Sequence, residues 1–147
     1  LEGAYLFLED VQDPGNVGTI IRTADAAGYQ GVFISSHSAD IYNLKTLRSM
    51  QGSHFHLPIY RVSREDMLTL ACQSDLQILA STLSEDSLDY QKVEKHENFL
   101  LVMGNEGQGI SQEMTDAADV LVHISMKGQA ESLNVAVAAG ILMFALS

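Results

Sequence analysis

Three short polar segments interrupt an otherwise apolar chain, and together they carry the residue types of a ligand site. They are residues 16–22 (NVGTIIR), 104–107 (GNEG) and 132–135 (SLNV). They offer a guanidinium that can bind a phosphate or carboxylate, one carboxylate, and several hydroxyl and amide groups. Each segment follows an apolar run typical of a strand, and two of them open a helix. Because parallel strands end at one edge of a sheet, we expect the three segments to form a single site there.

The first segment places Asn16 at the expected start of a helix over residues 17–27, which Gly28 ends. Arg22 lies six residues after Asn16, just under two turns on, which brings both side chains near the same face. Arg22 interrupts the apolar side of this helix, so its guanidinium needs an anionic or hydrogen-bonding partner. A phosphate or carboxylate is the obvious candidate. Asn16 by itself needs no function beyond that of a helix cap.

The second segment continues as GNEGQG over residues 104–109, a glycine-rich loop at the end of an expected strand. Its glycines do not match the G-x-G-x-x-G spacing of dinucleotide sites, and no Gly-Lys-Ser/Thr follows as in a phosphate-binding P-loop. The carboxylate of Glu106 would repel a phosphate, so it suits a ligand that offers donors or positive charge, or it orients Arg22 through a bidentate ion pair. The alternative is a tight turn with a solvated Glu106.

The third segment brings a hydroxyl, backbone groups and an amide to the positive end of the closing helix, expected over residues 131–146. These groups belong to Ser132, Leu133 and Asn134. Small residues in the first turns of that helix allow it to press close to a neighbour. The alternative is that Ser132 serves only as the helix N-cap.

Strand and helix patterns alternate along the whole chain. Apolar runs predict strands over residues 4–8, 31–35, 76–81, 99–103 and 120–124. Helical periodicity predicts helices over residues 17–27, 44–50, 64–73, 111–118 and 131–146, and an apolar stretch over residues 56–60 is broken by Pro58. This alternation predicts an α/β fold, a mostly parallel sheet with helices on both faces.

Composition favours one globular domain in a reducing compartment. A chain of 147 residues with 46% hydrophobic residues is long enough for one buried core and too short for two. No apolar stretch has the length of a membrane span. A single cysteine, Cys72, cannot form an internal disulfide, so we expect a cytoplasmic protein with Cys72 as a buried, inert thiol. Because the chain starts at Leu1 and enters a strand by Ala4, we also expect an N-terminal part of the natural protein to be missing.

The distribution of charge limits where a polyanion could bind. The formal net charge is −11, which argues against nonspecific coating of nucleic acid. Residues 41–64 nevertheless contain Lys45, Arg48, Arg61 and Arg64 and no acidic residue, whereas residues 65–147 contain 3 basic and 13 acidic residues. If the protein meets a polyanion, we expect contact through residues 41–64 and Arg22. The alternative is a chance cluster in an exposed loop and helix.

Taken together, the three segments resemble the motifs of the SpoU, or TrmH, family of RNA ribose 2′-O-methyltransferases in the SPOUT class. The resemblance rests on N-x-G-x-x-x-R at residues 16–22, G-N-E-G at 104–107, I-x-M at 124–126 and S-L-N-V-A at 132–136. Arg48 with Gly52 and the FHLPI stretch at residues 55–59 also resemble the middle region of this family. The similarity therefore covers nearly the whole chain.

The resemblance implies a methyltransferase that transfers a methyl group from S-adenosylmethionine to a ribose 2′-hydroxyl of RNA. It also implies a C-terminal trefoil knot and a homodimer with the site at its interface. Carried over by position, the cofactor residues would be Ser81, Thr82, Gly104, Ile124, Met126, Leu133 and Asn134. The catalytic residues would be Asn16, Arg22, Glu106, Ser132 and Asn134, and the RNA-binding residues Arg22, Lys45, Arg48, Arg61 and Arg64.

Within that resemblance, we expect residues 1–147 to be the catalytic domain, with Arg22 binding the target phosphate and stabilising the developing alkoxide. The family frequently carries an N-terminal RNA-binding domain, which would supply affinity. The substrate would be ribosomal RNA in preference to transfer RNA, and no metal is expected.

Two alternatives from other classes remain. An inactive SPOUT-like module that binds cofactor or RNA and dimerises would have little need for Arg22. A generic nucleotide-binding α/β domain is disfavoured by the glycine spacing.

Overall fold

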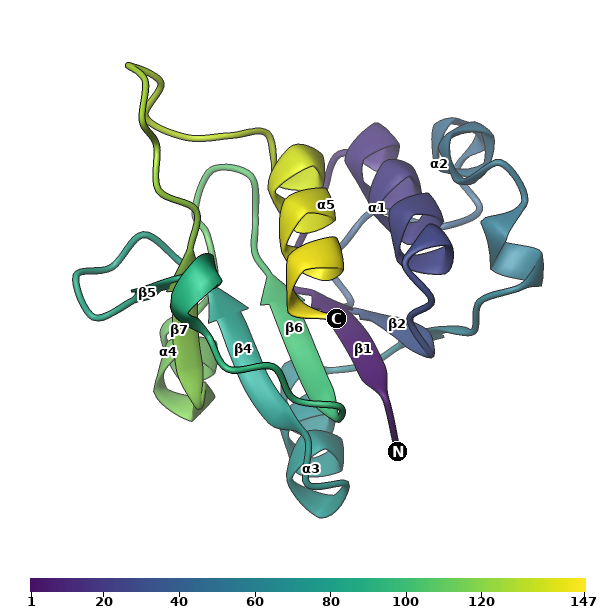
Figure 1. Cartoon of the computed structure of the whole chain (residues 1–147). Helices are drawn as coiled ribbons and strands as arrows, with labels where there is room; N and C mark the ends of the chain where they lie inside the picture. The colour runs from purple at the N-terminus through teal and green to yellow at the C-terminus, as the bar shows by residue number, and fades with distance from the viewer.

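Seven parallel strands form the centre of the molecule. The computed structural model describes all of residues 1–147, and its single sheet has the strand order β3-β2-β1-β6-β4-β7-β5, with every neighbouring pair parallel (Figure 1). The strands are β1 (Ala4–Leu8), β2 (Gly31–Ile34), β3 (Ile59–Arg61), β4 (Gln77–Ser81), β5 (Leu88–Asp89), β6 (Phe99–Met103) and β7 (Val120–His123).

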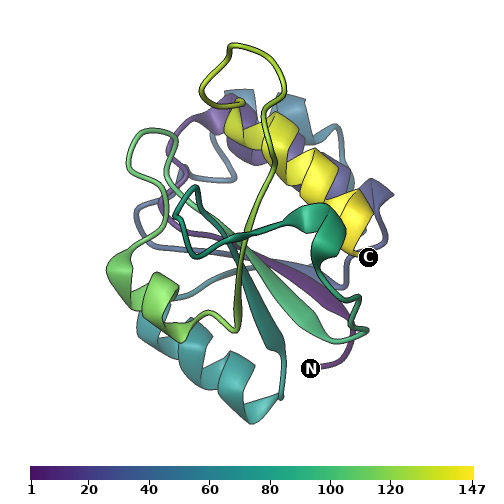
Figure 2. The same ribbon diagram turned by 60° about the vertical axis from the view of Figure 1, so that its left-hand side comes forward.

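Helices cover both faces of this sheet. On one face lie α1 (Pro14–Ala26) and α5 (Val135–Leu146), with α2 (Leu44–Met50) packed against α1 (Figure 1). On the other face lie α3 (Arg64–Gln73) and α4 (Gln112–Ala117), as Figure 2 shows from the side. Two short 3₁₀ turns, η1 (Ser53–Phe55) and η2 (Tyr90–Lys92), complete the elements. The predicted α/β fold with a parallel sheet between helices is confirmed.

Alternation along the central strands divides the core into two layers. In β1, Leu6 and Leu8 contribute to the larger apolar cluster, together with α1 and α5. Tyr5 and Phe7 point to the opposite face and contribute to the cluster with α3 and α4. Because both faces are covered, β1 and β6 read as continuous apolar runs in the sequence.

The strand order brings three loops together at one edge. Strands β6, β4 and β7 are neighbours and run in the same direction, so their carboxyl ends lie side by side. The loops that follow these three strands therefore gather at this edge, as Figure 1 shows. The loop after β7 is the segment that leads into α5. Such an edge of a parallel sheet is where α/β domains bind ligands.

Two helix starts differ from the sequence-based prediction. Helix α1 begins at Pro14, and its N-cap is Asp13, whose Oδ1 accepts from the Asn16 amide N–H at 3.0 Å. The side chain of Asn16 is therefore not the cap, contrary to expectation. Helix α5 begins at Val135 with Asn134 as its N-cap, so the prediction of a helix from residue 131 is wrong, and the alternative that Ser132 is only the N-cap is excluded.

Other differences concern short or exposed features. Strand β5 has two residues and lies in a connection that showed only polar character, and β3 follows Pro58 within the broken apolar stretch. Cys72 is exposed and not buried as expected. No helix combines the length and apolar character needed to span a bilayer. The trefoil knot implied by the resemblance stays a prediction.

Candidate functional site

A cavity of about 410 Å³ lies where the ends of β4, β6 and β7 meet the start of α5. Six of the seven residues expected to bind the cofactor line it: Ser81, Thr82, Gly104, Ile124, Met126 and Leu133. The seventh, Asn134, lies between the lining residues Leu133 and Val135 without lining the cavity itself. The second and third polar segments of the sequence therefore line one cavity, whereas no residue of the first segment, 16–22, lines it.

The loop of residues 104–109 forms the largest continuous part of the cavity wall. Asn105 and Gly109 pair as an antiparallel bridge through two backbone hydrogen bonds of 3.1 and 2.9 Å. The Oδ1 atom of Asn105 also accepts from the amides of Gly107 and Gln108, at 2.9 and 3.0 Å. A Cβ on Gly104 would lie 2.3 Å from the carbonyl carbon of Gly109, so only glycine fits this closed loop.

Glu106 binds the start of α1 and not Arg22. Its carboxylate accepts from the amides of Gln12 (3.1 Å) and Asp13 (2.8 Å) and, at 3.5 Å, from Nδ2 of Asn16. Partial burial alone would raise the pKa of Glu106, but these hydrogen bonds outweigh burial and lower the pKa below its ordinary value. A bidentate pair between Glu106 and Arg22, one of the possibilities left open by the sequence, is absent.

Asn16 connects the other two polar segments. Its Oδ1 atom accepts from Nδ2 of Asn134 at 3.2 Å, while its own Nδ2 donates to Glu106. Asn134 in turn caps α5 by accepting from the amides of Ala136 and Val137. A chain of side chains thus runs from the start of α5, through the first turn of α1, to the loop that follows β6.

Arg22 lies elsewhere, on the exposed side of α1. Ile20, Ile21 and Ala24 are fully buried, whereas Arg22 is exposed, so the expectation that its guanidinium interrupts the apolar face is wrong. It lines a separate shallow hollow of about 480 Å³, together with Thr19, Thr23, Ala26, Ser49, Gln51 and Phe144. Within one chain, Arg22 does not reach the cavity beside Glu106 and Ser132.

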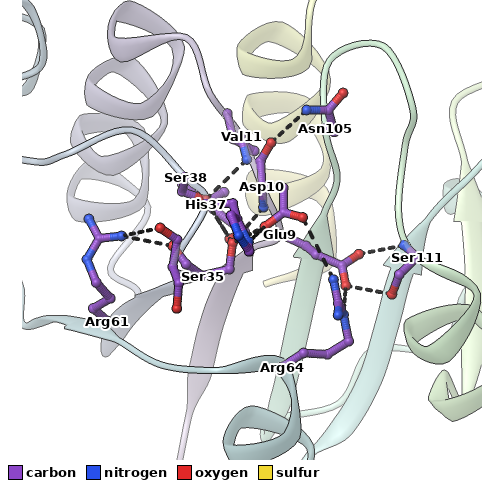
Figure 3. A network of polar contacts seen from close by, with 12 residues as sticks. Glu9, Asp10, Val11, Ser35, His37, Ser38, Arg61, Arg64, Asn105 and Ser111 are labelled. Atoms are coloured by element: carbon purple, nitrogen blue, oxygen red, sulfur yellow. Dashed lines mark hydrogen bonds and ion pairs between the residues drawn. The ribbon is translucent and has the colours of Figure 1, made fainter.

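The basic residues of segment 41–64 divide into two groups. Lys45 and Arg48 on α2 are exposed and form no ion pair. Arg61 donates to the carbonyl oxygens of Ser35 and Ser36, as Figure 3 shows. Arg64 is three-quarters buried and forms ion pairs with three carboxylates. The structure therefore corrects the expectation that the Arg64 guanidinium is available for RNA.

His123 is a lining residue that the sequence reasoning missed. Its Nδ1 atom lies 2.8 Å from the Ser87 hydroxyl, and its Nε2 atom lies 3.2 Å from the Ser125 hydroxyl. Ser125 also donates to Asp89 and is the main cause of the lowered pKa of Asp89. These contacts join the ends of β5 and β7, and no motif signalled them. The other missed lining residues include Leu83, Met103, Asn105, Gln108 and Ala138.

Comparison with known proteins places this arrangement in a family. The sequence model of the SpoU rRNA Methylase family matches residues 3–144. The chain belongs to this family. SpoU relatives include the 23S rRNA (guanosine(2553)-2′-O)-methyltransferase RlmP of Bacillus subtilis (strain 168), which is 43% identical over 141 residues. That match covers 96% of this chain and 56% of the relative.

Solved structures of SpoU relatives share the fold closely. The AdoMet-bound rRNA methyltransferase from Sinorhizobium meliloti is 40% identical, with a TM-score of 0.93 over 98% of this chain and 55% of that one. The SpoU methyltransferase AviRb from Streptomyces viridochromogenes, in complex with the cofactor AdoMet, is 34% identical, with a TM-score of 0.89 over 97% of this chain and 58% of that one. This chain thus spans about half the length of the relatives it matches.

Proposed function

We propose that this SpoU-family chain is the catalytic domain of an RNA methyltransferase that uses S-adenosylmethionine to methylate a ribose 2′-hydroxyl of ribosomal RNA. The observation that carries the proposal is the cavity at the carboxyl ends of β4, β6 and β7, which the G-N-E-G, I-x-M and S-L-N-V-A motifs line. Two solved relatives with the same fold are complexes with the cofactor AdoMet.

The cavity fits S-adenosylmethionine in size and chemistry. Its volume of about 410 Å³ lies within the range of small-molecule sites. Ile124, Met126 and Leu133 offer apolar surface for an adenine ring, and the loop of residues 104–109 offers main-chain groups beside them. When bound, the cofactor supplies an electrophilic methyl group on a sulfonium.

The residues of the chain itself would position the RNA. A guanidinium offers five N–H donors and no acceptor atom, so we do not assign Arg22 to proton removal. We assign it to the target phosphate and to the negative charge that develops on the ribose oxygen. Asn16, Glu106 and Asn134 keep the first turn of α1 against the cavity, and Ser132 presents a hydroxyl at its rim. Alignment of the ribose hydroxyl with the methyl group of the cofactor is then the main source of rate acceleration.

A homodimer would bring Arg22 to the cavity of a second copy. Arg22 does not line the cavity of its own chain, and its hollow also contains the exposed ring of Phe144 on α5. Val137 on the same helix is 51% exposed. An arginine beside apolar side chains suits an interface between two copies. We therefore propose that each active site combines one cavity with Arg22 of the partner.

Complementation tests this arrangement. One chain carries Arg22→Gln and keeps its cavity, and the other carries Gly104→Ala and keeps its arginine. Neither homodimer should methylate RNA, but mixed dimers should contain one complete site, which restores about a quarter of the wild-type activity in an equal mixture. Mixing without recovery would exclude the shared site.

Ribosomal RNA is the substrate we favour, because the Bacillus subtilis relative is named for 23S rRNA. A cytoplasmic location suits that substrate. Transfer of a labelled methyl group from the cofactor should label 23S rRNA and leave transfer RNA unlabelled, and nuclease digestion should locate the label on a ribose. Binding of S-adenosylhomocysteine without any transfer would instead favour the inactive module.

A further inference from the structure

One short segment, residues 9–13, fixes both ends of the loop that lines the cavity. The carbonyl oxygen of Asp10 accepts from Nδ2 of Asn105 at 2.8 Å, at the start of the loop. The carboxylate of Glu9 accepts from the amide and the hydroxyl of Ser111, both at 2.6 Å, just after its end. Figure 3 shows these contacts on either side of the same stretch of chain. The shape of the loop therefore depends on residues about a hundred positions earlier.

Glu9 is a buried charge, and Arg64 balances it. Glu9 is 1% exposed, and a carboxylate removed from water needs a cation and several donors. Arg64, the first residue of α3, donates from Nε to the same carboxylate that binds Ser111. Its guanidinium also lies 3.8 Å from Asp10 and 3.5 Å from Glu113 on α4. The hydrogen bond to Glu9 is the main reason that the pKa of Arg64 is raised.

The neighbouring backbone is equally constrained. Asp10 adopts a left-handed conformation, with φ of 60°, which a residue other than glycine adopts only with support. Ser35 gives that support by accepting from the Asp10 amide at 2.7 Å and donating to its carboxylate at 2.6 Å. The Ser38 hydroxyl accepts from the Val11 amide at 3.1 Å. Segment 9–13 is thus held by the connection that follows β2 and by α3, independently of the loop of residues 104–109.

We propose that Glu9 and Arg64 are positioning residues that give the loop of residues 104–109 its cofactor-binding shape before the cofactor arrives. The inference rests on the proposed function, because it takes the cavity to be the cofactor site. Removing the cation leaves the Glu9 carboxylate buried without its charged partner, so water enters or the carboxylate reorients, and its hydrogen bonds to Ser111 weaken. Loss of that contact frees one end of the loop of residues 104–109, and all six residues of this loop line the cavity.

The test compares Arg64→Gln with Lys95→Gln in the 147-residue chain. Both variants remove one positive charge, but Lys95 is exposed and forms no ion pair. For each variant, calorimetry measures S-adenosylhomocysteine affinity, and hydrogen exchange without ligand measures protection of the bridged amides of Asn105 and Gly109. RNA affinity is measured as a function of salt.

We expect Arg64→Gln to weaken S-adenosylhomocysteine binding by about tenfold or more and to speed exchange at Asn105 and Gly109, with strand β6 still protected. Lys95→Gln should change neither quantity. Arg64→Lys keeps the charge without the planar fork and should fall between wild type and Arg64→Gln. If Arg64→Gln loses protection in every element, the chain has unfolded. The S-adenosylhomocysteine affinity and the exchange of Asn105 and Gly109 in Arg64→Lys then test the proposal.

Unchanged affinity and unchanged exchange in Arg64→Gln would overturn the proposal. So would intact cofactor binding combined with weaker, less salt-dependent RNA binding, because Arg64 would then act as an RNA contact. If the wild-type chain binds no S-adenosylhomocysteine, the proposed function fails, whereas the exchange measurement still decides whether Arg64 orders the loop.

Discussion

The Nδ2 atom of Asn134 donates to the Oδ1 atom of Asn16 at 3.2 Å, which joins the N-terminal ends of helices α5 and α1. The orientation of both amides follows from their other partners. Oδ1 of Asn134 is occupied by two amides of its own helix, so only its NH₂ group faces Asn16. Asn16 must then present oxygen to Asn134 and nitrogen to Glu106. This single arrangement fixes how the three motif segments meet.

Replacing Asn134 with aspartate separates its two tasks. Aspartate caps a helix as well as asparagine does, but it has no NH₂ group to donate to Asn16. We expect Asn134→Asp to lower the free energy of unfolding by about 1 kcal/mol, measured by urea denaturation. Asn43→Asp is the matched control, because Asn43 caps α2 through Lys45 without a second side-chain partner. Equal effects of the two substitutions would contradict a stabilising link between Asn134 and Asn16.

The close approach of Gly104 to Gly109 should be essential for cofactor binding. An added methyl group at position 104 would overlap backbone at 2.3 Å, so Gly104→Ala must open the loop. We expect S-adenosylhomocysteine affinity to fall by about tenfold or more in calorimetry. Gly128→Ala meets no atom within 4 Å and should bind as the wild type does. A Gly104→Ala chain with normal affinity would show that the wall of the cavity does not depend on this closure.

Arg22 should affect turnover without affecting cofactor affinity. Lysine retains the charge but not the planar, bidentate geometry that matches a phosphate, so we expect Arg22→Lys to reduce methyl transfer by about tenfold or more. Arg22→Gln should reduce it further. Because Arg22 lies outside the cavity of its own chain, S-adenosylhomocysteine binding should stay the same in both variants. Near-normal turnover of Arg22→Lys would contradict bidentate binding of the phosphate by Arg22.

The exposed cations of α2 should carry the salt dependence of RNA binding. Lys45 and Arg48 have no ion-pair partner, so each can displace a counterion from RNA. The double substitution Lys45→Gln with Arg48→Gln should lower the slope of log affinity against log salt by about 1 to 2. Lys92→Gln with Lys95→Gln removes the same charge from another surface and should leave the slope unchanged. Equal slopes in the two variants would place the RNA elsewhere.

Acid should destabilise the chain partly through Glu106. The pKa of Glu106 is lower in the folded state than in the unfolded state, so its contribution is present above the unfolded value of about 4.3 and is lost as pH falls through the lower folded value. We therefore expect Glu106→Gln to reduce the pH dependence of unfolding free energy below about pH 4.5, where this carboxylate takes up its proton. Urea denaturation at several pH values measures the difference. An identical acid slope in both proteins would exclude the contribution.

The sequence predicted the sheet well because its central strands are buried on both faces. β1 and β6 therefore appear as unbroken apolar runs, whereas β5 has two residues and no such signal. The start of α1 was missed although Asp13 with Pro14 matches the usual order of cap and first-turn proline. The N-x-G-x-x-x-R motif pointed to Asn16 as the cap instead.

The contacts of the arginines could not be predicted from spacing. Arg22 is exposed because α5 and the sheet cover the other side of α1, which is a property of the packing and not of the helix alone. Arg64 reads as one of four cations in a basic segment, yet its partner Glu9 lies 55 residues away in the sequence. The motifs predicted most of the residues that line the cavity. The hydrogen bonds and ion pairs that hold these residues in place could be found only in the structure.

The partners that shape the site are far apart in the order of synthesis. Asp10 with Asn105, Glu9 with Ser111 and Asn16 with Asn134 are separated by 95, 102 and 118 residues. A ribosome synthesises β1, α1, β2 and α3 long before it releases Asn105, Ser111 and Asn134, the later partners in these contacts. Contacts of such long sequence separation form slowly, because a large loop must close first. The N-terminal half can therefore fold first, and the ligand cavity is complete only when α5 has packed against α1.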